Sequence, residues 1–215
     1  LLGGRSPRTI NMSTIGDDLL RQASAAFGPK IEALVVYNSN PVAVAPDSKQ
    51  VVAGFTREDL FTVVLEHFMT DTADHADYVL PATTQLEHLD LHTAYGHTYV
   101  LLNQPAIAPL GEAKPNTQIF RELAARLGFD DPCFGDDDEA LARSALIGVD
   151  MQTLRRQGWV KLPLPDAPFA HGGFPTPNGK ARVVAPGLGV PDFVPPYECA
   201  EAAPALAARY PLAMI

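Results

Sequence analysis

The pattern of apolar and polar residues predicts that strands alternate with helices in the first half of the chain. Three apolar runs without polar alternation occupy residues 31–37, 60–65 and 78–80, which is typical of parallel strands covered on both faces. Between them, residues 46–56 can hold one short helix and residues 72–77 a turn or two. This order predicts an α/β fold, a Rossmann-like parallel sheet with flanking helices and right-handed crossovers.

Helical periodicity predicts further helices on both sides of these runs. Residues 13–25 fit a helix in which Ser13 is the N-cap, and Pro29 prevents its continuation. The clearest pattern covers residues 116–127, where one apolar stripe ends at a glycine. Shorter helical patterns follow at residues 137–147 and 151–157.

The last quarter of the chain is less regular. Residues 99–103 and 181–185 are strand-like, and the chain becomes rich in Pro and Gly after Trp159. We therefore expect an α/β domain over residues 1–158 and an irregular extension over residues 159–215 that leads toward a further C-terminal domain. Because the chain begins without Met and ends in an apolar run, we expect it to be a piece of a longer polypeptide.

Charge and cysteine content narrow the class of protein. A net charge of −9 and a pI near 5.0 argue against nucleic acid, whose phosphates require a basic face. No apolar run approaches the roughly 18 residues that span a bilayer. Cys133 and Cys199 have no iron–sulfur or zinc spacing. They are expected to be unlinked thiols, which favours the cytoplasm, whereas a signal outside this chain would direct the protein to the periplasm.

Small polar side chains follow two neighbouring predicted strands, where open α/β sheets bind nucleotide-like ligands. Those after the first strand are Asn38, Ser39 and Asn40, followed by Pro41. Those after the second strand are Thr70, Asp71 and Thr72. Turn residues leave backbone N–H groups free for an anion, and Asp71 can accept hydrogen bonds from a guanine-like ring. An ordinary Asx turn and a simple helix cap are the structural alternatives.

A group of histidines supports a rival hypothesis. If the segment were helical, His88 and His92 would share a face, and Asp90 or His97 could complete the metal site of a small metal-dependent hydrolase. The segment alternates as readily as a strand does, which would place His88, Asp90 and His92 on one polar face. No serine-nucleophile motif or Gly-rich phosphate loop is present in the sequence.

An ordered set of short motifs across nearly the whole chain resembles the molybdopterin oxidoreductases of the dimethyl sulfoxide reductase family. The set includes Tyr-Asn-Ser-Asn-Pro, Thr-Asp-Thr-Ala and Val-Leu-Pro-Ala. The matching segments are residues 36–41, 57–64, 70–73, 76–77, 79–82, 95–97, 110–114, 120–124, 174–180 and 210–212. No single motif would be specific, but their common order is.

The resemblance implies a domain that holds one of two molybdopterin guanine dinucleotides, which together chelate molybdenum or tungsten. It places Asn38, Ser39, Asn40 and Pro41 near the phosphates, and Thr70, Asp71 and Thr72 near the nucleotide. Glu87 and His97 are weaker candidates beside the pterin. Asp77 is expected to be structural, tying the start of its strand to the neighbouring strand.

The resemblance also implies what lies outside this chain. The full enzyme would transfer electrons or an oxygen atom at the metal. The family resemblance also allows an iron–sulfur cluster in the N-terminal part of the full enzyme. The chain has no metal-ligating or catalytic residue, so we expect it to be inactive alone. Its expected partners are the remaining domains and an electron-transfer subunit, and its apolar surface toward those domains should favour self-association. A non-catalytic interaction module is the other alternative.

Overall fold

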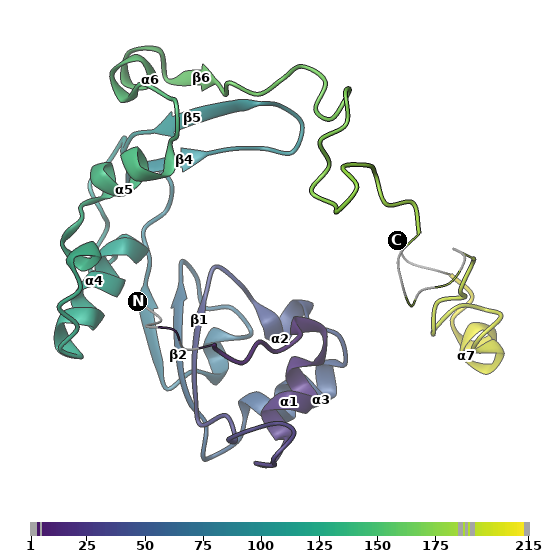
Figure 1. The fold of residues 1–215 in the computed structure, drawn as a ribbon. Coiled ribbons are helices and arrows are strands. Elements are labelled where there is room, and N and C mark those ends of the chain that lie inside the picture. Colours follow the sequence, from purple (N-terminus) through teal and green to yellow (C-terminus); the bar gives the residue numbers. More distant parts are fainter. Residues whose placement is uncertain (1–3, 5, 185–186, 188, 190–191, 213–215) are drawn as a thin grey trace. The chain divides into compact units, whose positions relative to one another are not determined.

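The structure, a computed structural model, describes residues 4, 6–184, 187, 189 and 192–212. The chain forms two compact units, Leu1–Pro163 and Leu164–Ile215. The first unit contains two three-stranded sheets, one parallel and one antiparallel (Figure 1). No helix in the described part of the chain is long and apolar enough to cross a membrane.

The parallel sheet confirms the predicted α/β class. Its strands are β1 (Ala33–Tyr37), β2 (Phe61–Glu66) and β3 (Tyr78–Pro81), in the order β1-β2-β3. Each strand lies within two residues of its predicted bounds. In the register of the sheet, Val36 is level with Val64, and Val64 with Val79.

Three short helices and one 3-10 turn pack on one face of this sheet and enclose a hydrophobic core with it. They are α1 (Ile15–Leu20), α2 (Pro41–Val44), α3 (Ser48–Phe55) and η2 (Ala73–His75). Figure 1 shows α1, α2 and α3 gathered on the same side of β1 and β2. The buried side chains are apolar and come from both layers: Leu19, Val36, Val42, Val51, Phe55, Leu60, Val64 and Ala73.

Glycines permit the close contact between α1 and α3. A Cβ atom at Gly16 would lie 2.7 Å from the backbone nitrogen of Val51, and one at Gly54 would lie 2.8 Å from Cβ of Leu19. Helix α1 can therefore rest on α3 at a distance that no larger residue allows.

The prediction of one helix over residues 13–25 is wrong. A 3-10 turn, η1 (Met12–Thr14), comes first and is capped by Asn11 rather than Ser13, and α1 ends at Leu20. Arg57 caps this end, because its guanidinium donates to the carbonyl oxygens of Leu19 and Ile31. This contact uses a carbonyl at the end of α1 and fixes the chain beside the start of β1.

Asp77 ties β3 to β2, as the sequence predicted. Its Oδ2 accepts a hydrogen bond from the Thr62 backbone N–H at 2.7 Å, and its own N–H donates to the Thr62 carbonyl at 2.9 Å. Both backbone groups of the fully buried Thr62 are therefore paired with one residue.

Replacing Asp77 with Ala should destabilise the 215-residue chain by about 1 to 2 kcal/mol, because it leaves the buried Thr62 N–H without an acceptor. Urea unfolding measures this change. Asp77→Asn is the matched control, since it retains a side-chain oxygen and should lose less stability than Asp77→Ala. Equal stability of Asp77→Ala and wild type would contradict a structural role.

The antiparallel sheet contains β4 (Asp90–His92), β5 (Tyr99–Asn103) and β6 (Trp159–Lys161), in the order β4-β5-β6. Helices α5 (Asp138–Ala145) and α6 (Met151–Gln157) pack on this sheet, and α4 (Asn116–Arg126) and η3 (Pro132–Gly135) precede them along the chain. The predicted helices are confirmed here to within two residues at each end, as is the strand β5. A second core consists of Val100, Leu102, Ala142, Met151 and Leu154.

The second unit contains one helix, α7 (Pro204–Arg209), among its described residues. The expected irregular extension is therefore not confirmed as such. Residues 181–184 form no strand, so the strand predicted over residues 181–185 is wrong for its described part, and residue 185 lies outside the described residues. Within this unit the rings of Phe169 and Phe174 stack, with their centroids 4.6 Å apart.

Candidate functional site

The loops after β1 and β2 are held together by one hydrogen-bonded pair, the half-buried Asn40 and the buried Thr72. Oδ1 of Asn40 accepts hydrogen bonds from the hydroxyl of Thr72 at 2.6 Å and from its backbone N–H at 3.2 Å. The same hydroxyl accepts from the Val42 N–H at 3.0 Å, and Thr72 is fully buried. Both residues follow neighbouring strands in the sequence, and the structure brings them into contact.

The loop after β1 owes its path to its residue types. Asn38 has a φ of 55°, a left-handed conformation that asparagine tolerates better than most residues. Asn38 and Ser39 are exposed, whereas Pro41 is buried as the first residue of α2. The loop therefore turns outward at its tip and is anchored at its end by Pro41 and Asn40.

Both loops present backbone N–H groups that have no acceptor among the described residues. In the part of the chain that the structure describes, no group accepts a hydrogen bond from the N–H of Ser39, Asn40 or residues 68–71. The Nδ2 group of Asn40 is likewise unpaired within these residues, because only its Oδ1 is engaged. Backbone N–H groups without an acceptor at the ends of parallel strands can donate to an anion.

Thr70 and Asp71 occupy the turn before η2. The hydroxyl of Thr70 accepts from the Ala73 N–H at 3.3 Å, and its carbonyl accepts from the Asp74 N–H at 3.0 Å. The exposed carboxylate of Asp71 has no hydrogen-bond or ion-pair partner among the described residues. Thr72 thus has a structural contact, whereas Asp71 is free to meet a ligand.

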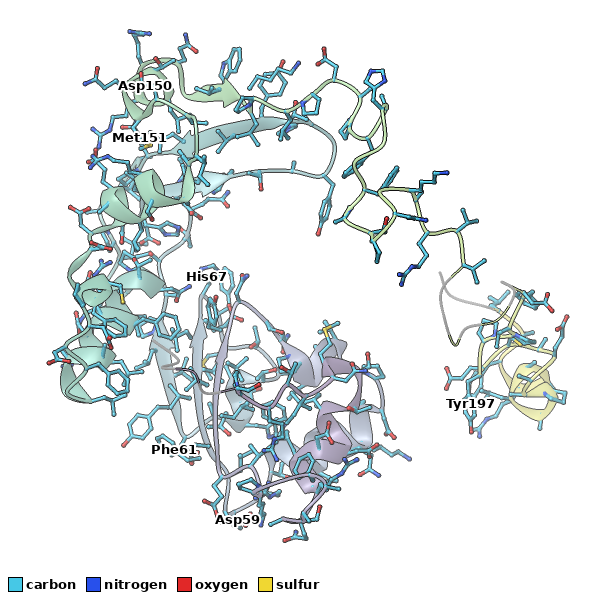
Figure 2. All side chains as sticks on the ribbon, in the orientation of Figure 1. Asp59, Phe61, His67, Asp150, Met151 and Tyr197 are labelled. Carbon is cyan, nitrogen blue, oxygen red and sulfur yellow. The ribbon has the colours of Figure 1, made fainter. Side chains whose placement is uncertain are left out.

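A contact between the loops after β2 and β3 was not predicted from the sequence. His67 directly follows β2, and its Nε2 lies 3.0 Å from the carbonyl oxygen of Thr83, so it lies at the same edge of the sheet (Figure 2). The hydroxyl of the buried Thr83 lies 2.8 Å from Nδ1 of His88. The position of His67 two residues after the predicted strand 60–65 was the available signal.

Glu87 and His97 form their hydrogen bonds with residues other than Asn40 and Thr72. The buried carboxylate of Glu87 accepts from the N–H and hydroxyl of Thr84, at 2.7 and 2.8 Å, and from the Leu110 N–H at 2.7 Å. His97 is exposed, and its Nδ1 accepts from the Tyr99 N–H at 3.2 Å beside β5. Contact of either residue with a cofactor stays a prediction.

Hydrogen bonds from Thr84 and Leu110 lower the pKa of Glu87 from its usual 4.5. A carboxyl whose pKa is lowered by folding contributes stability that is present above its unfolded pKa and is lost as the pH falls through the folded value. The stability advantage of wild type over Glu87→Gln should therefore be largest near neutrality and shrink below pH 4.5. Urea unfolding at several pH values measures it, with the exposed Glu112→Gln as control. A pH-independent difference would contradict this account.

The histidine cluster takes the strand geometry, not the helical one. His88 and His92 each place Nε2 near Oδ2 of Asp90, at 3.9 and 3.7 Å, around strand β4. No group of three His, Cys, Asp or Glu side chains in the described ranges could hold a metal ion. The alternation predicted for this segment is confirmed, and the hydrolase hypothesis gains no support.

Comparisons with known proteins identify the family. The family model described as Molybdopterin oxidoreductase matches residues 11–126, more than half of the chain. Two Bacillus subtilis (strain 168) proteins are similar. Probable oxidoreductase YoaE is 43% identical over 191 residues, covering 85% of this chain and 27% of that protein. Probable oxidoreductase YyaE is 34% identical over 178 residues, covering 80% and 26%.

A solved structure is also similar to this chain. Acetylene hydratase from Pelobacter acetylenicus superposes with a TM-score of 0.73 at 26% sequence identity, over 94% of this chain and 28% of that one. The chain spans about a quarter of the length of the proteins it matches. This chain belongs to the molybdopterin oxidoreductase family.

Proposed function

We propose that the loops after β1 and β2 bind one molybdopterin guanine dinucleotide as part of a larger molybdenum or tungsten oxidoreductase. The observation that carries the proposal is the Asn40–Thr72 pair, which fixes two loops with unpaired backbone donors at the carboxyl edge of a parallel sheet. Such an edge is where open α/β sheets hold nucleotides. Family membership supports a molybdopterin cofactor, and the loop geometry supports the dinucleotide form.

The residues present fit the anionic part of this cofactor. The N–H groups of Ser39 and Asn40, with those of residues 68–71, can donate to phosphate oxygens, and so can Nδ2 of Asn40. The free carboxylate of Asp71 can accept from the N1–H and exocyclic amine of guanine. The Thr72 hydroxyl orients Asn40 and has no proton left to donate to a phosphate, because its one O–H donates to Asn40 Oδ1.

The chain's share of the chemistry is binding and orientation. When bound, the cofactor supplies redox chemistry at its metal, and the protein positions it and shapes its electrostatic surroundings. We infer that the remaining domains of the same polypeptide close the site, and that an iron–sulfur cluster and an electron-transfer subunit serve the full enzyme. Redox turnover by the 215 residues alone would contradict this division.

Chemical analysis of the purified full-length protein tests the proposal. Acid hydrolysis should release GMP, and elemental analysis should find molybdenum or tungsten in proportion to it. A metal-loaded protein that releases no guanine nucleotide would overturn the dinucleotide assignment. If the complete coding sequence lacks a metal-ligating segment, that finding would instead support the hypothesis of a non-catalytic interaction module.

A further inference from the structure

The two faces of the parallel sheet are both apolar in sequence. The face that packs on α1, α2 and α3 contains Leu34, Val36, Val64 and Val79. By the alternation of side chains along a strand, the opposite face carries Ala33, Val35, Tyr37, Phe61, Val63, Leu65, Tyr78 and Leu80. None of these eight is charged. Strands that are apolar on both faces are typical of parallel sheets with cover on both sides.

The second face is open over much of its area. We call Val35, Phe61 and Tyr78 the open patch; their side chains come from all three strands and are exposed by 49%, 50% and 62%. The rings of Phe61 and Tyr78 contact edge to face, 5.9 Å apart. Figure 2 shows Phe61 on the side of the sheet away from α1 and α3. An apolar patch of this kind marks an interaction surface.

Helix α4 covers only the carboxyl end of this face. Phe120 of α4 meets Tyr37 at the end of β1, with ring centroids 5.3 Å apart, and the neighbouring Leu65 is buried. The open patch lies toward the amino ends of the strands, beyond this contact. The cover is therefore partial, and the described residues supply no further layer over Val35, Phe61 and Tyr78.

We propose that the open patch is the docking site for an amphipathic helix from the part of the same polypeptide outside residues 1–215. Two observations select this occupant. The related proteins are about four times as long as the matched segment, so most of the polypeptide lies outside it. A parallel sheet is ordinarily covered by helices of its own chain, and the uncharged patch offers no ion-pair sites for a polar partner.

Thiol labelling tests this proposal, using the full-length protein and the 215-residue chain side by side. Val35→Cys places a thiol in the open patch, and Val36→Cys is the matched control on the helix-covered face, where Val36 is only 6% exposed. Both are made with Cys133 and Cys199 replaced by Ser, and labelled sites are located by peptide mass spectrometry. Tyr78→Cys provides a second position on another strand.

The expected result is rapid labelling of the Val35→Cys thiol in the 215-residue chain and labelling about tenfold slower or more in the full-length protein. The Val36→Cys thiol should be protected in both. Equal rates for Val35→Cys and Tyr78→Cys in both proteins would overturn the proposal. So would protection in the monomeric 215-residue chain, or protection of the full-length protein that disappears on dilution to a monomer, which would indicate a second copy.

Discussion

Replacing Asn40 with Asp in the full-length protein is expected to weaken cofactor retention by about tenfold to a thousandfold while preserving the fold. The new carboxylate keeps an oxygen for the two Thr72 donors. It removes the free Nδ2 donor and adds a negative charge facing the proposed phosphates. Two like charges about 4 Å apart repel by about 1 kcal/mol in bulk water and by about 4 kcal/mol near a protein surface. Metal and GMP content per protein measure the effect.

Asn178→Asp is the matched control for this substitution. Asn178 also uses its side-chain oxygen as an acceptor, from the Thr176 hydroxyl and the Lys180 N–H, both at 3.1 Å. The same change of charge there, in the second unit, should leave metal and GMP content unchanged. Unchanged metal content in Asn40→Asp, with wild-type unfolding behaviour, would contradict the phosphate role of this loop.

Replacing Gly16 with Ala is expected to destabilise the 215-residue chain by about 3 kcal/mol, near the upper end for overpacked cores. The added Cβ would lie 2.7 Å from the Val51 nitrogen and 2.8 Å from the Gln50 carbonyl carbon. Because these are backbone atoms of α3, α1 would have to move as a unit. The gain in helix propensity, about 1 kcal/mol for Gly to Ala, is too small to offset this.

Urea unfolding measures the loss, with Gly135→Ala as the control. A Cβ atom at Gly135 would meet no atom of the described structure within 4 Å, so this variant should unfold close to wild type. A Gly16→Ala chain as stable as wild type would show that α1 does not rest on α3 as closely as the structure indicates. The Asn40–Thr72 pair would be unaffected by that outcome.

The parallel sheet was predictable because its signal is local. Each strand is one apolar run ended by Pro or by polar residues, and its neighbour in the sheet is the next strand along the chain. The antiparallel sheet was not predicted, because β6 joins β5 across α4, α5 and α6. The contact that caps the end of α1 was equally hidden, since Arg57 is distant in sequence.

The candidate site was predicted by position but not in its internal contacts. Residues after adjacent parallel strands had to lie at one edge, so Asn40 and Thr72 were expected to be neighbours. That Thr72 would be buried, so that only the Asp71 carboxylate and the backbone N–H groups are available to the proposed ligand, depends on side-chain geometry that spacing does not encode. The approach of His67 to Thr83 depends on the same kind of geometry.

A crystal structure of the metal-loaded full-length protein would test the central claim most directly. The account predicts a guanine dinucleotide whose phosphates lie within hydrogen-bond distance of the backbone N–H groups of Ser39, Asn40 and residues 68–71, with the base on the Asp71 carboxylate. A dinucleotide bound elsewhere, with both loops facing only solvent or protein, would contradict it.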